Sequence, residues 1–152
     1  MRVGVAVDHT GFTLKDRLVK ELRAVGHEVV DFGAPAYAPD DDYTDYTVPL
    51  ARAVVDGAVA RGIAVCDNAI GACIAANKIR GIRAGTCHDQ SSAGRGVQDD
   101  NMNVLCLGAF PAAFELKWDL VQAFLAAHFD GADCHIRSLM KIDRLEEPEI
   151  HG

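Results

Sequence analysis

The residues with the richest chemistry in this 152-residue sequence follow its short apolar runs. Cys66 ends one such run and is followed by Asp67, Asn68, Ala69, Ile70, Gly71 and Ala72. If a helix starts in this turn, its free backbone N–H groups and the positive end of its dipole converge on one point. Such a point stabilises a developing oxyanion and lowers the pKa of a nearby thiol. Cys66 is therefore a candidate base or nucleophile; the alternative is an inert buried thiol.

A polar pair, Asp8-His9, follows the first apolar run. A histidine beside the start of a helix can donate a hydrogen bond to a phosphate or a sugar hydroxyl. The alternative is a capping aspartate with an incidental surface histidine. For the later pair His88-Asp89, a helix cap with a solvent-exposed histidine is the favoured interpretation.

Other acidic pairs are typical of solvated surface. Asp99-Asp100 is expected in a solvated turn, and the aspartates at 40–42 in a surface loop. Tyr43, next to that loop, has an aromatic face that can stack on a sugar. The sequence thus offers Tyr43 as a ligand contact without requiring it.

Strands and helices are predicted to alternate along the whole chain. Apolar runs predict strands at Val3–Val7, His27–Phe32, Gly62–Cys66, Ile82–Thr86 and Asn103–Leu107. Helical spacing of apolar residues predicts helices over 11–25, 46–59, 70–78, 91–97, 111–128 and 135–145. This order predicts an α/β fold: a Rossmann-like, open parallel five-stranded sheet with helices on both faces, in three layers. We expect a single domain over residues 1–152, because no linker or repeat divides the sequence.

Open parallel sheets bind ligands beyond the carboxyl ends of their strands. In the predicted sheet this edge carries Asp8-His9, the turn after Cys66, His88-Asp89 and Gly108-Ala109. We therefore expect the functional site there.

Composition narrows the class of protein. The net charge of −7 argues against a general nucleic-acid binder, which needs a basic face. No apolar run approaches the roughly 20 residues of a membrane-spanning helix, so we expect no membrane partner. The five cysteines lack metal-type spacing and the N-terminus lacks a signal-peptide pattern, which predicts a cytoplasmic protein with reduced thiols.

Several motifs, in consistent order, resemble the family of ribose-5-phosphate isomerase B and the galactose-6-phosphate isomerases. The matching stretches are Asp8-His9-Thr10-Gly11-Phe12, Asp42-Tyr43, Ile74-Ala75-Ala76-Asn77-Lys78, Gly81-Ile82-Arg83-Ala84, Cys87-His88-Asp89 and Asn103-Val104-Leu105. They correspond to that family's D-H-x-G-[FY], D-Y-P, I-A-A-N-K and G-I-R-A patterns and to its later segments. The resemblance runs through nearly the whole chain.

The resemblance implies an aldose–ketose isomerisation through a cis-enediolate, without metal or cofactor. It makes Cys66 the base and the backbone amides of residues 67–72 the cradle for the enediolate. Asp8, His9 and Tyr43 would contact the sugar or sugar phosphate. The resemblance also implies a homodimer or homotetramer whose sites draw on two subunits, with the helix at about 135–146 at the interface.

The sequence also departs from the family pattern. Where the family has G-T-G-I-G after the cysteine, this chain has Asp67-Asn68-Ala69-Ile70-Gly71, so that Asn68 replaces a threonine. Asp99 stands where the family has a ring-opening histidine, followed by Asp100 as a further expected substrate contact. The family's phosphate-binding arginines align with Cys134, Ser138 and Phe110, which leaves Arg137 as a neighbouring substitute.

The main hypothesis is an isomerase of ribose 5-phosphate and ribulose 5-phosphate or of a related sugar, with Cys66, Asn68 and Asp99 as catalytic residues. The departures motivate an alternative, a catalytically silent or substrate-altered paralogue that binds a sugar or serves as a partner subunit. A third hypothesis, from the fold alone, is a flavodoxin-like nucleotide or flavin binder.

Overall fold

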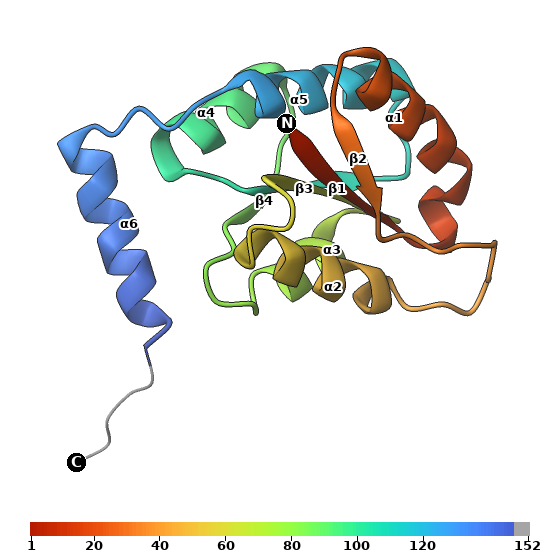
Figure 1. Cartoon of the computed structure of the whole chain (residues 1–152), viewed down its shortest axis with the longest axis horizontal. Helices are drawn as coiled ribbons and strands as arrows, with labels where there is room; N and C mark the ends of the chain where they lie inside the picture. The colour runs from red at the N-terminus through yellow and green to blue at the C-terminus, as the bar shows by residue number, and fades with distance from the viewer. Residues whose placement is uncertain (148–152) are drawn as a thin grey trace.

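One parallel sheet of five strands forms the centre of the computed structural model, which describes residues 1–147 (Figure 1). The strands are β1 (Arg2–Val7), β2 (Glu28–Asp31), β3 (Arg61–Cys66), β4 (Ala84–Thr86) and β5 (Val104–Gly108). Their order across the sheet is β2-β1-β3-β5-β4. The strand β4 thus lies outside β5, although it precedes β5 in the sequence. The strand β3 lies at the centre of the sheet, hydrogen-bonded to β1 on one side and to β5 on the other.

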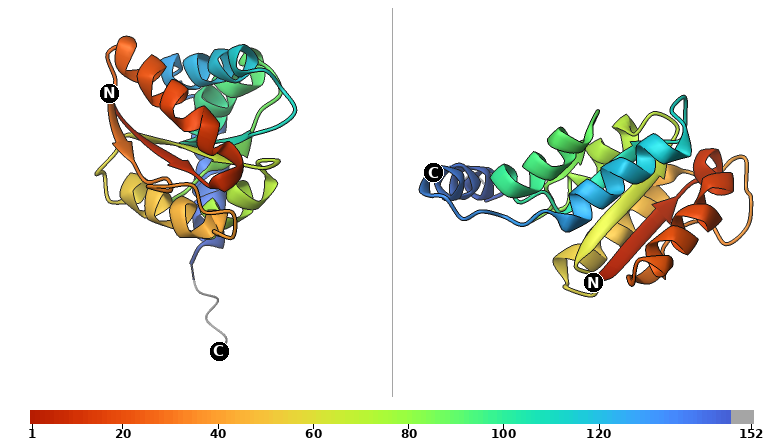
Figure 2. Two further views of the ribbon diagram at one scale, coloured as in Figure 1. Left: turned by 90° about the vertical axis from the view of Figure 1, so that its right-hand side faces the viewer. Right: turned by 90° about the horizontal axis from the view of Figure 1, so that it is seen from above.

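Helices cover both faces of this sheet. They are the short 3-10 helix η1 (His9–Gly11) and the α-helices α1 (Phe12–Ala24), α2 (Tyr43–Val55), α3 (Ile70–Ala76), α4 (Gln90–Asp100), α5 (Phe114–Ala126) and α6 (Asp133–Leu145). α1, α4 and α5 lie on one face and α2 and α3 on the other, as the views in Figures 1 and 2 agree. The predicted three-layer α/β architecture is confirmed.

The sheet separates two hydrophobic cores, because alternate residues of a strand point to opposite faces. In β3, Ile63 and Val65 belong to the core under α1, α4 and α5, which also contains Phe124. Ala64 and Cys66 belong to the core under α2 and α3. Cys66 therefore faces the layer of α2 and α3.

The observed helices differ from the predicted ones mainly at their ends. The second helix was expected over 46–59, but α2 spans Tyr43–Val55. It ends before Gly57, which adopts a left-handed conformation with a φ of 73° and turns the chain. The sequence had a stop signal at this glycine, and the expected helix ran past it.

The helix α6 is unlike the others, because it projects from the body of the molecule and packs mainly beside α4 (Figure 1). None of its residues is buried in a single subunit. Its exposed apolar side chains include Ile136, Met140 and Leu145. Within residues 1–147, no helix combines the length and the apolarity needed to cross a membrane.

Candidate active site at the ends of β1 and β3

A pocket of about 320 Å³ opens where β1 and β3 end side by side. Val7 of β1 is in register with Val65 of β3, and the next amide, that of Asp8, donates to the Val65 carbonyl over 3.4 Å. From β1 the chain continues to β2 on one side, while β3 lies on the other, which makes this the switch point where open sheets bind ligands. The pocket is lined by Asp8, Tyr43, Cys66, Asp67, Asn68, Ile70, Gly71 and Ile74.

Cys66 lies in the wall of this pocket with only 3% of its surface exposed. Burial raises the pKa of its thiol above the ordinary value, and the charge of Asp8 adds to the rise. Hydrogen bonds from the backbone N–H groups of Ala72, Ala69 and Asn68 act in the opposite direction but do not outweigh burial. The expected depression of the Cys66 pKa is therefore wrong for the single subunit. Of the amides that motivated that expectation, those of Asn68, Ala69 and Ala72 do act on the thiol.

The turn between Cys66 and α3 holds this cradle in an unusual backbone conformation. Ala69 has a φ of 68°, in the left-handed region that disfavours residues with a Cβ atom. The side-chain oxygen of Asn68 accepts a hydrogen bond from the Ile70 amide over 3.1 Å and so closes the turn. Asp67 and Asn68 are exposed, whereas Ala69 and Ala72 are buried against the sheet. Local backbone strain of this kind is often found at functional sites.

Tyr43 lies directly over Gly71 at the mouth of the pocket. A Cβ atom added at Gly71 would sit 2.6 Å from Cζ of Tyr43 and 2.9 Å from its hydroxyl oxygen. Only glycine permits this approach between the first residue of α2 and the first turn of α3. The contact explains why the two residues line the same pocket.

Asp8 and His9 make separate contacts. The Asp8 carboxylate is 4% exposed and caps η1 by accepting from the amides of Thr10 and Gly11. His9 Nδ1 lies 2.6 Å from Oδ1 of Asp41, and the His9 amide donates to the same oxygen over 3.1 Å. The Asp41 hydrogen bond raises the pKa of His9 above 6.5, with a further contribution from the Asp8 charge, although burial opposes the rise.

Asp41 is the site residue that sequence reasoning missed. It was expected on a loop surface, but its side chain is only 5% exposed. The correction has a physical reason: the loop folds back over η1, where His9 binds the carboxylate twice. Nothing in the spacing of three consecutive aspartates distinguishes the middle one, so the sequence carried no signal for this pairing.

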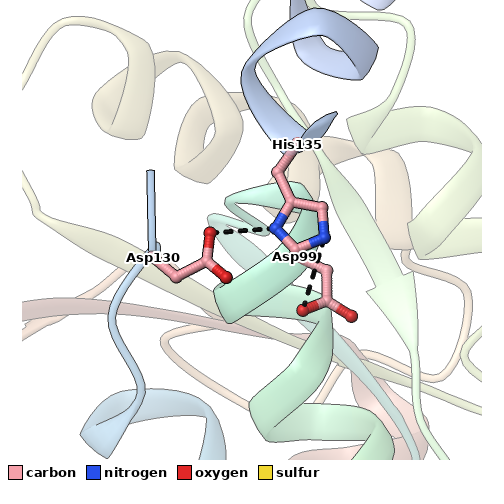
Figure 3. Close-up of side chains that lie close together, drawn as sticks. All are labelled: Asp99, Asp130 and His135. Carbon is pink, nitrogen blue, oxygen red and sulfur yellow. Dashed lines mark hydrogen bonds and ion pairs between the residues drawn. The ribbon is translucent and has the colours of Figure 1, made fainter. Parts of the chain in front are cut away.

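Asp99 lies elsewhere in the subunit, on the last turn of α4 (Figure 3). Arg95 donates to its Oδ2 over 3.0 Å, and His135 Nε2 lies 3.9 Å from its Oδ1. His135 Nδ1 is also 2.9 Å from Oδ1 of Asp130, and this hydrogen bond raises the pKa of His135. The two carboxylates, the imidazole and the guanidinium thus satisfy one another.

The remaining expected contacts are also distant from Cys66 within one chain. Asp100 lines a different hollow together with Met102 and Ile142. Arg137 is exposed on α6, and no α6 residue lines the Cys66 pocket. Any role of Asp99, Asp100 and Arg137 at a Cys66 site thus stays a prediction that needs a second subunit.

A larger cavity of about 650 Å³ lies on the other side of the 68–70 turn. Its wall includes His88, Asp89, Cys106 and Lys117. Asp89 caps α4 by accepting from the Ser92 amide over 2.7 Å, in a reciprocal capping box. The favoured interpretation of His88-Asp89 as a helix cap with an exposed histidine is confirmed.

A buried thiol beside backbone amides thus lies at the switch point of a parallel sheet, where amide N–H groups can stabilise a developing oxyanion. The chain matches the Ribose/Galactose Isomerase family model over residues 3–142. It belongs to that family and is an isomerase.

Individual relatives agree with this assignment. The chain is 34% identical to D-erythrulose-4-phosphate isomerase of Pectobacterium atrosepticum, over 99% of both chains. It superposes on the structure of ribose-5-phosphate isomerase B from Clostridium thermocellum with a TM-score of 0.91, at 36% identity, covering 96% of this chain and 97% of the other. The corresponding protein of Mycoplasma genitalium, solved with bound ribulose-5-phosphate, gives a TM-score of 0.90 at 35% identity, with 95% of each chain covered.

Proposed function

We propose that the protein interconverts an aldose phosphate and a ketose phosphate, with Cys66 as the base that moves the proton between C1 and C2. One observation carries the proposal: Cys66 lines the pocket at the ends of β1 and β3, together with the turn that leads into α3. The backbone N–H groups of Asn68, Ala69 and Ala72 act on its thiol in the direction that lowers its pKa. The names of the related proteins support the sugar-phosphate class of substrate.

In the proposed reaction the Cys66 thiolate takes the proton on C2 of the aldose. The electron pair left on carbon forms a cis-enediolate, whose oxygens accept hydrogen bonds from the amides of residues 67–72. The proton then returns to C1, while a hydroxyl proton moves from O2 to O1. Burial raises the pKa of Cys66, so its thiolate is a stronger base than an exposed one. Asn68 has a side-chain amide that can donate to a substrate oxygen but cannot shuttle a proton.

His9 is the cation that we assign to the phosphate end of the substrate. Its hydrogen bond to Asp41 holds Nδ1 and raises the pKa of His9, which favours the charged imidazolium over the neutral ring. An imidazolium beside the start of η1 and α1 attracts a phosphate dianion. Asp41 thereby positions His9 rather than touching the substrate.

The four-carbon pair erythrose and erythrulose 4-phosphate is the substrate that we favour over the five-carbon pair. Ribose 5-phosphate closes into a ring through its C4 hydroxyl, and this ring must open before C2 loses its proton. A four-carbon 4-phosphate has that oxygen esterified and stays open. Asp99, at the family's ring-opening position, is already paired with Arg95. The chain therefore lacks an available ring-opening group in the position where the family has one.

A homodimer is the assembly that we propose. The exposed apolar side chains of α6 would be covered by a second subunit, as amphipathic helices require. Such an assembly would let Asp99, Asp100 and Arg137 of one subunit reach the Cys66 pocket of the other. Light scattering on a size-exclusion column tests it: Met140→Asp should yield monomers, and an unchanged dimer would contradict the use of this face.

Deuterium exchange tests the chemistry directly. The protein is incubated in heavy water with erythrulose 4-phosphate or ribulose 5-phosphate, and deuterium entry at C1 is followed by NMR. The wild-type protein should exchange the four-carbon substrate faster, Cys66→Ala should not exchange either, and Cys87→Ala, a matched change of a half-buried cysteine outside the pocket, should exchange normally. Full exchange by Cys66→Ala would remove Cys66 from the mechanism. No exchange by the folded wild-type dimer with either sugar would favour the silent paralogue.

A further inference from the structure

Two lysines are buried in the described chain, and they differ in what surrounds their charge. Lys15 of α1 has the usual arrangement of a buried cation, because its ammonium lies 3.1 Å from Oδ2 of Asp31. Lys117, at the end of the first turn of α5, is only 6% exposed. Its ammonium donates to the Ala112 carbonyl, and among residues 1–147 it makes no ion pair with a carboxylate. Lys117 thus carries a buried charge without a counter-charge.

This arrangement destabilises the protein on its own. Moving an ammonium group out of water is unfavourable unless an anion or several acceptors replace the water. The position of Lys117 adds to the penalty, because the positive end of the α5 dipole lies at the same turn. Burial accordingly lowers the pKa of Lys117. An anion that enters beside the ammonium would relieve both penalties.

The nearby acidic residues do not supply that anion. Glu115 is paired with Arg17, whose guanidinium lies 2.7 Å from Oε1 of the carboxylate. Asp119 lies two residues after Lys117, and residues at this spacing do not face each other on a helix. Asp89, in the wall of the same cavity as Lys117, caps α4. The anion that fits the ammonium must therefore come from a ligand.

Lys117 lies where two hollows meet at the carboxyl edge of the sheet. It lines the 650 Å³ cavity and also a smaller hollow of about 230 Å³ that reaches η1 at Thr10. The larger cavity shares Asn68 and Ile70 with the Cys66 pocket. A ligand in the Cys66 pocket can therefore extend past this turn toward the ammonium.

The smaller hollow borders the Cys66 pocket as well, through the polar residues at the end of β1. The Thr10 hydroxyl donates to Oδ1 of Asp8 over 2.5 Å, and Asp8 lines the Cys66 pocket. His9, which we assign to the phosphate end of the substrate, lies between these two residues in the chain. The loop after β5, which also lines the smaller hollow, starts beside the same pocket, because the Ala109 amide donates to the Cys66 carbonyl over 2.8 Å.

We propose that Lys117 binds the phosphate group of the substrate, an inference that rests on the proposed function. The carbon chain of the sugar phosphate would start in the Cys66 pocket, and its phosphate would lie between the Lys117 ammonium and His9. An ammonium has three donors, of which Ala112 takes one, so that two remain for phosphate oxygens. Lys117 contacts the part of the substrate that does not react, so it strengthens binding and leaves the proton transfer to Cys66.

Unfolding of the full-length protein in inorganic phosphate tests the site independently of catalysis. The wild type should unfold at a higher urea concentration in phosphate than in sodium chloride of equal ionic strength, because phosphate binds the folded state. Lys117→Met keeps the apolar stem and removes the charge. In chloride this variant should be at least as stable as the wild type, and phosphate should not stabilise it.

Two matched variants separate Lys117 from charge in general. Lys20→Met removes an exposed lysine of α1. Arg17→Met removes a cation in the wall of the smaller hollow that Glu115 already neutralises. Both variants should keep the stabilisation by phosphate. Equal loss in Arg17→Met and Lys117→Met would show that the hollow acts only by its overall charge, and would overturn the assignment.

Steady-state kinetics with erythrulose 4-phosphate supply the second measurement. Loss of a charge-assisted contact corresponds to about 10-fold to 100-fold in affinity, so Lys117→Met should raise KM by this factor and leave kcat nearly unchanged. A variant that is less stable in chloride and has a lower kcat would mean that Lys117 serves the fold through Ala112, which refutes the inference.

The two proposals can fail separately. If the wild type exchanges no sugar proton but phosphate stabilises it in a Lys117-dependent way, the proposed function fails and the anion site stands. If the wild type is an active isomerase and Lys117→Met keeps its KM and its response to phosphate, the anion site fails and the proposed function stands. A wild type that phosphate does not stabilise beyond chloride also contradicts the site.

Discussion

Replacing Gly71 with alanine should separate stability from activity, because the two respond in opposite directions. The new Cβ would lie 2.6 Å from Cζ of Tyr43. Carbon atoms in contact are separated by about 3.5–4.0 Å, so the ring must move by roughly 1 Å. Tyr43 is partly exposed and can swing toward solvent, so the fold tolerates the change.

The size of each effect follows from that displacement. A shift of about 1 Å in a group that positions the substrate costs up to roughly 100-fold in rate, or about 2.7 kcal/mol in transition-state binding. In contrast, Gly→Ala within a helix adds up to about 1 kcal/mol of stability. We therefore expect Gly71→Ala to be at least as stable as the wild type and to have a kcat/KM between 10-fold and 100-fold lower.

Urea unfolding and initial-rate kinetics measure the two quantities. The matched control is Gly94→Ala, a helical glycine whose added Cβ meets nothing within 4 Å, which should keep full activity. A Tyr43→Ala background should abolish most of the effect of Gly71→Ala, because the colliding ring is gone. Wild-type kcat/KM in Gly71→Ala, or a full additional loss in the double variant, would refute the reasoning.

Three further predictions test other parts of the structure. Ala69→Gly should stabilise the protein by about 1 kcal/mol in urea unfolding, because glycine relieves the left-handed strain at this position; a destabilised variant would show that Ala69 packing matters more. Asp41→Asn should return the NMR-detected pKa of His9 toward 6.5. Because the pKa of His9 is raised in the folded state, the ion pair between His9 and Asp41 contributes its full stability below about pH 6.5, and this contribution is lost as the pH rises through the raised pKa. This pH dependence of stability should disappear in Asp41→Asn. A His9 pKa that does not move would contradict the pairing. Phe124→Ala, in the core under α1, α4 and α5, should lower the free energy of unfolding by about 3–5 kcal/mol while the folded fraction keeps its kcat/KM.

Much of the fold was predictable because its signals are local. Each strand is a short apolar run, and the carboxyl ends of parallel strands must meet at one edge. That rule alone brought Asp8, Cys66 and the turn after Cys66 together. Tyr43 was a possible sugar contact because of its aromatic face, and the family resemblance supported it. Those residues do line one pocket in the structure.

The features that the sequence did not reveal depend on contacts between distant segments. Whether a helix start lowers the pKa of Cys66 depends on how deeply the thiol is buried, and burial here outweighs the amides. Asp41 meets His9 only because a loop 32 residues away folds over η1.

The alternation of side chains along β3 has a consequence for how this enzyme can change. In the described chain, every residue that lines the Cys66 pocket comes from a strand end, from α2, from α3 or from the turn before α3, and none comes from α1, α4 or α5. The sheet therefore separates the Cys66 pocket, on the face covered by α2 and α3, from the core on the opposite face. That second core contains most of the large apolar side chains, such as Phe124. Substitutions in the core under α1, α4 and α5 can change thermal stability, while substitutions in the Cys66 pocket change substrate choice. The two kinds of change should interfere little, because they lie on opposite faces of the sheet.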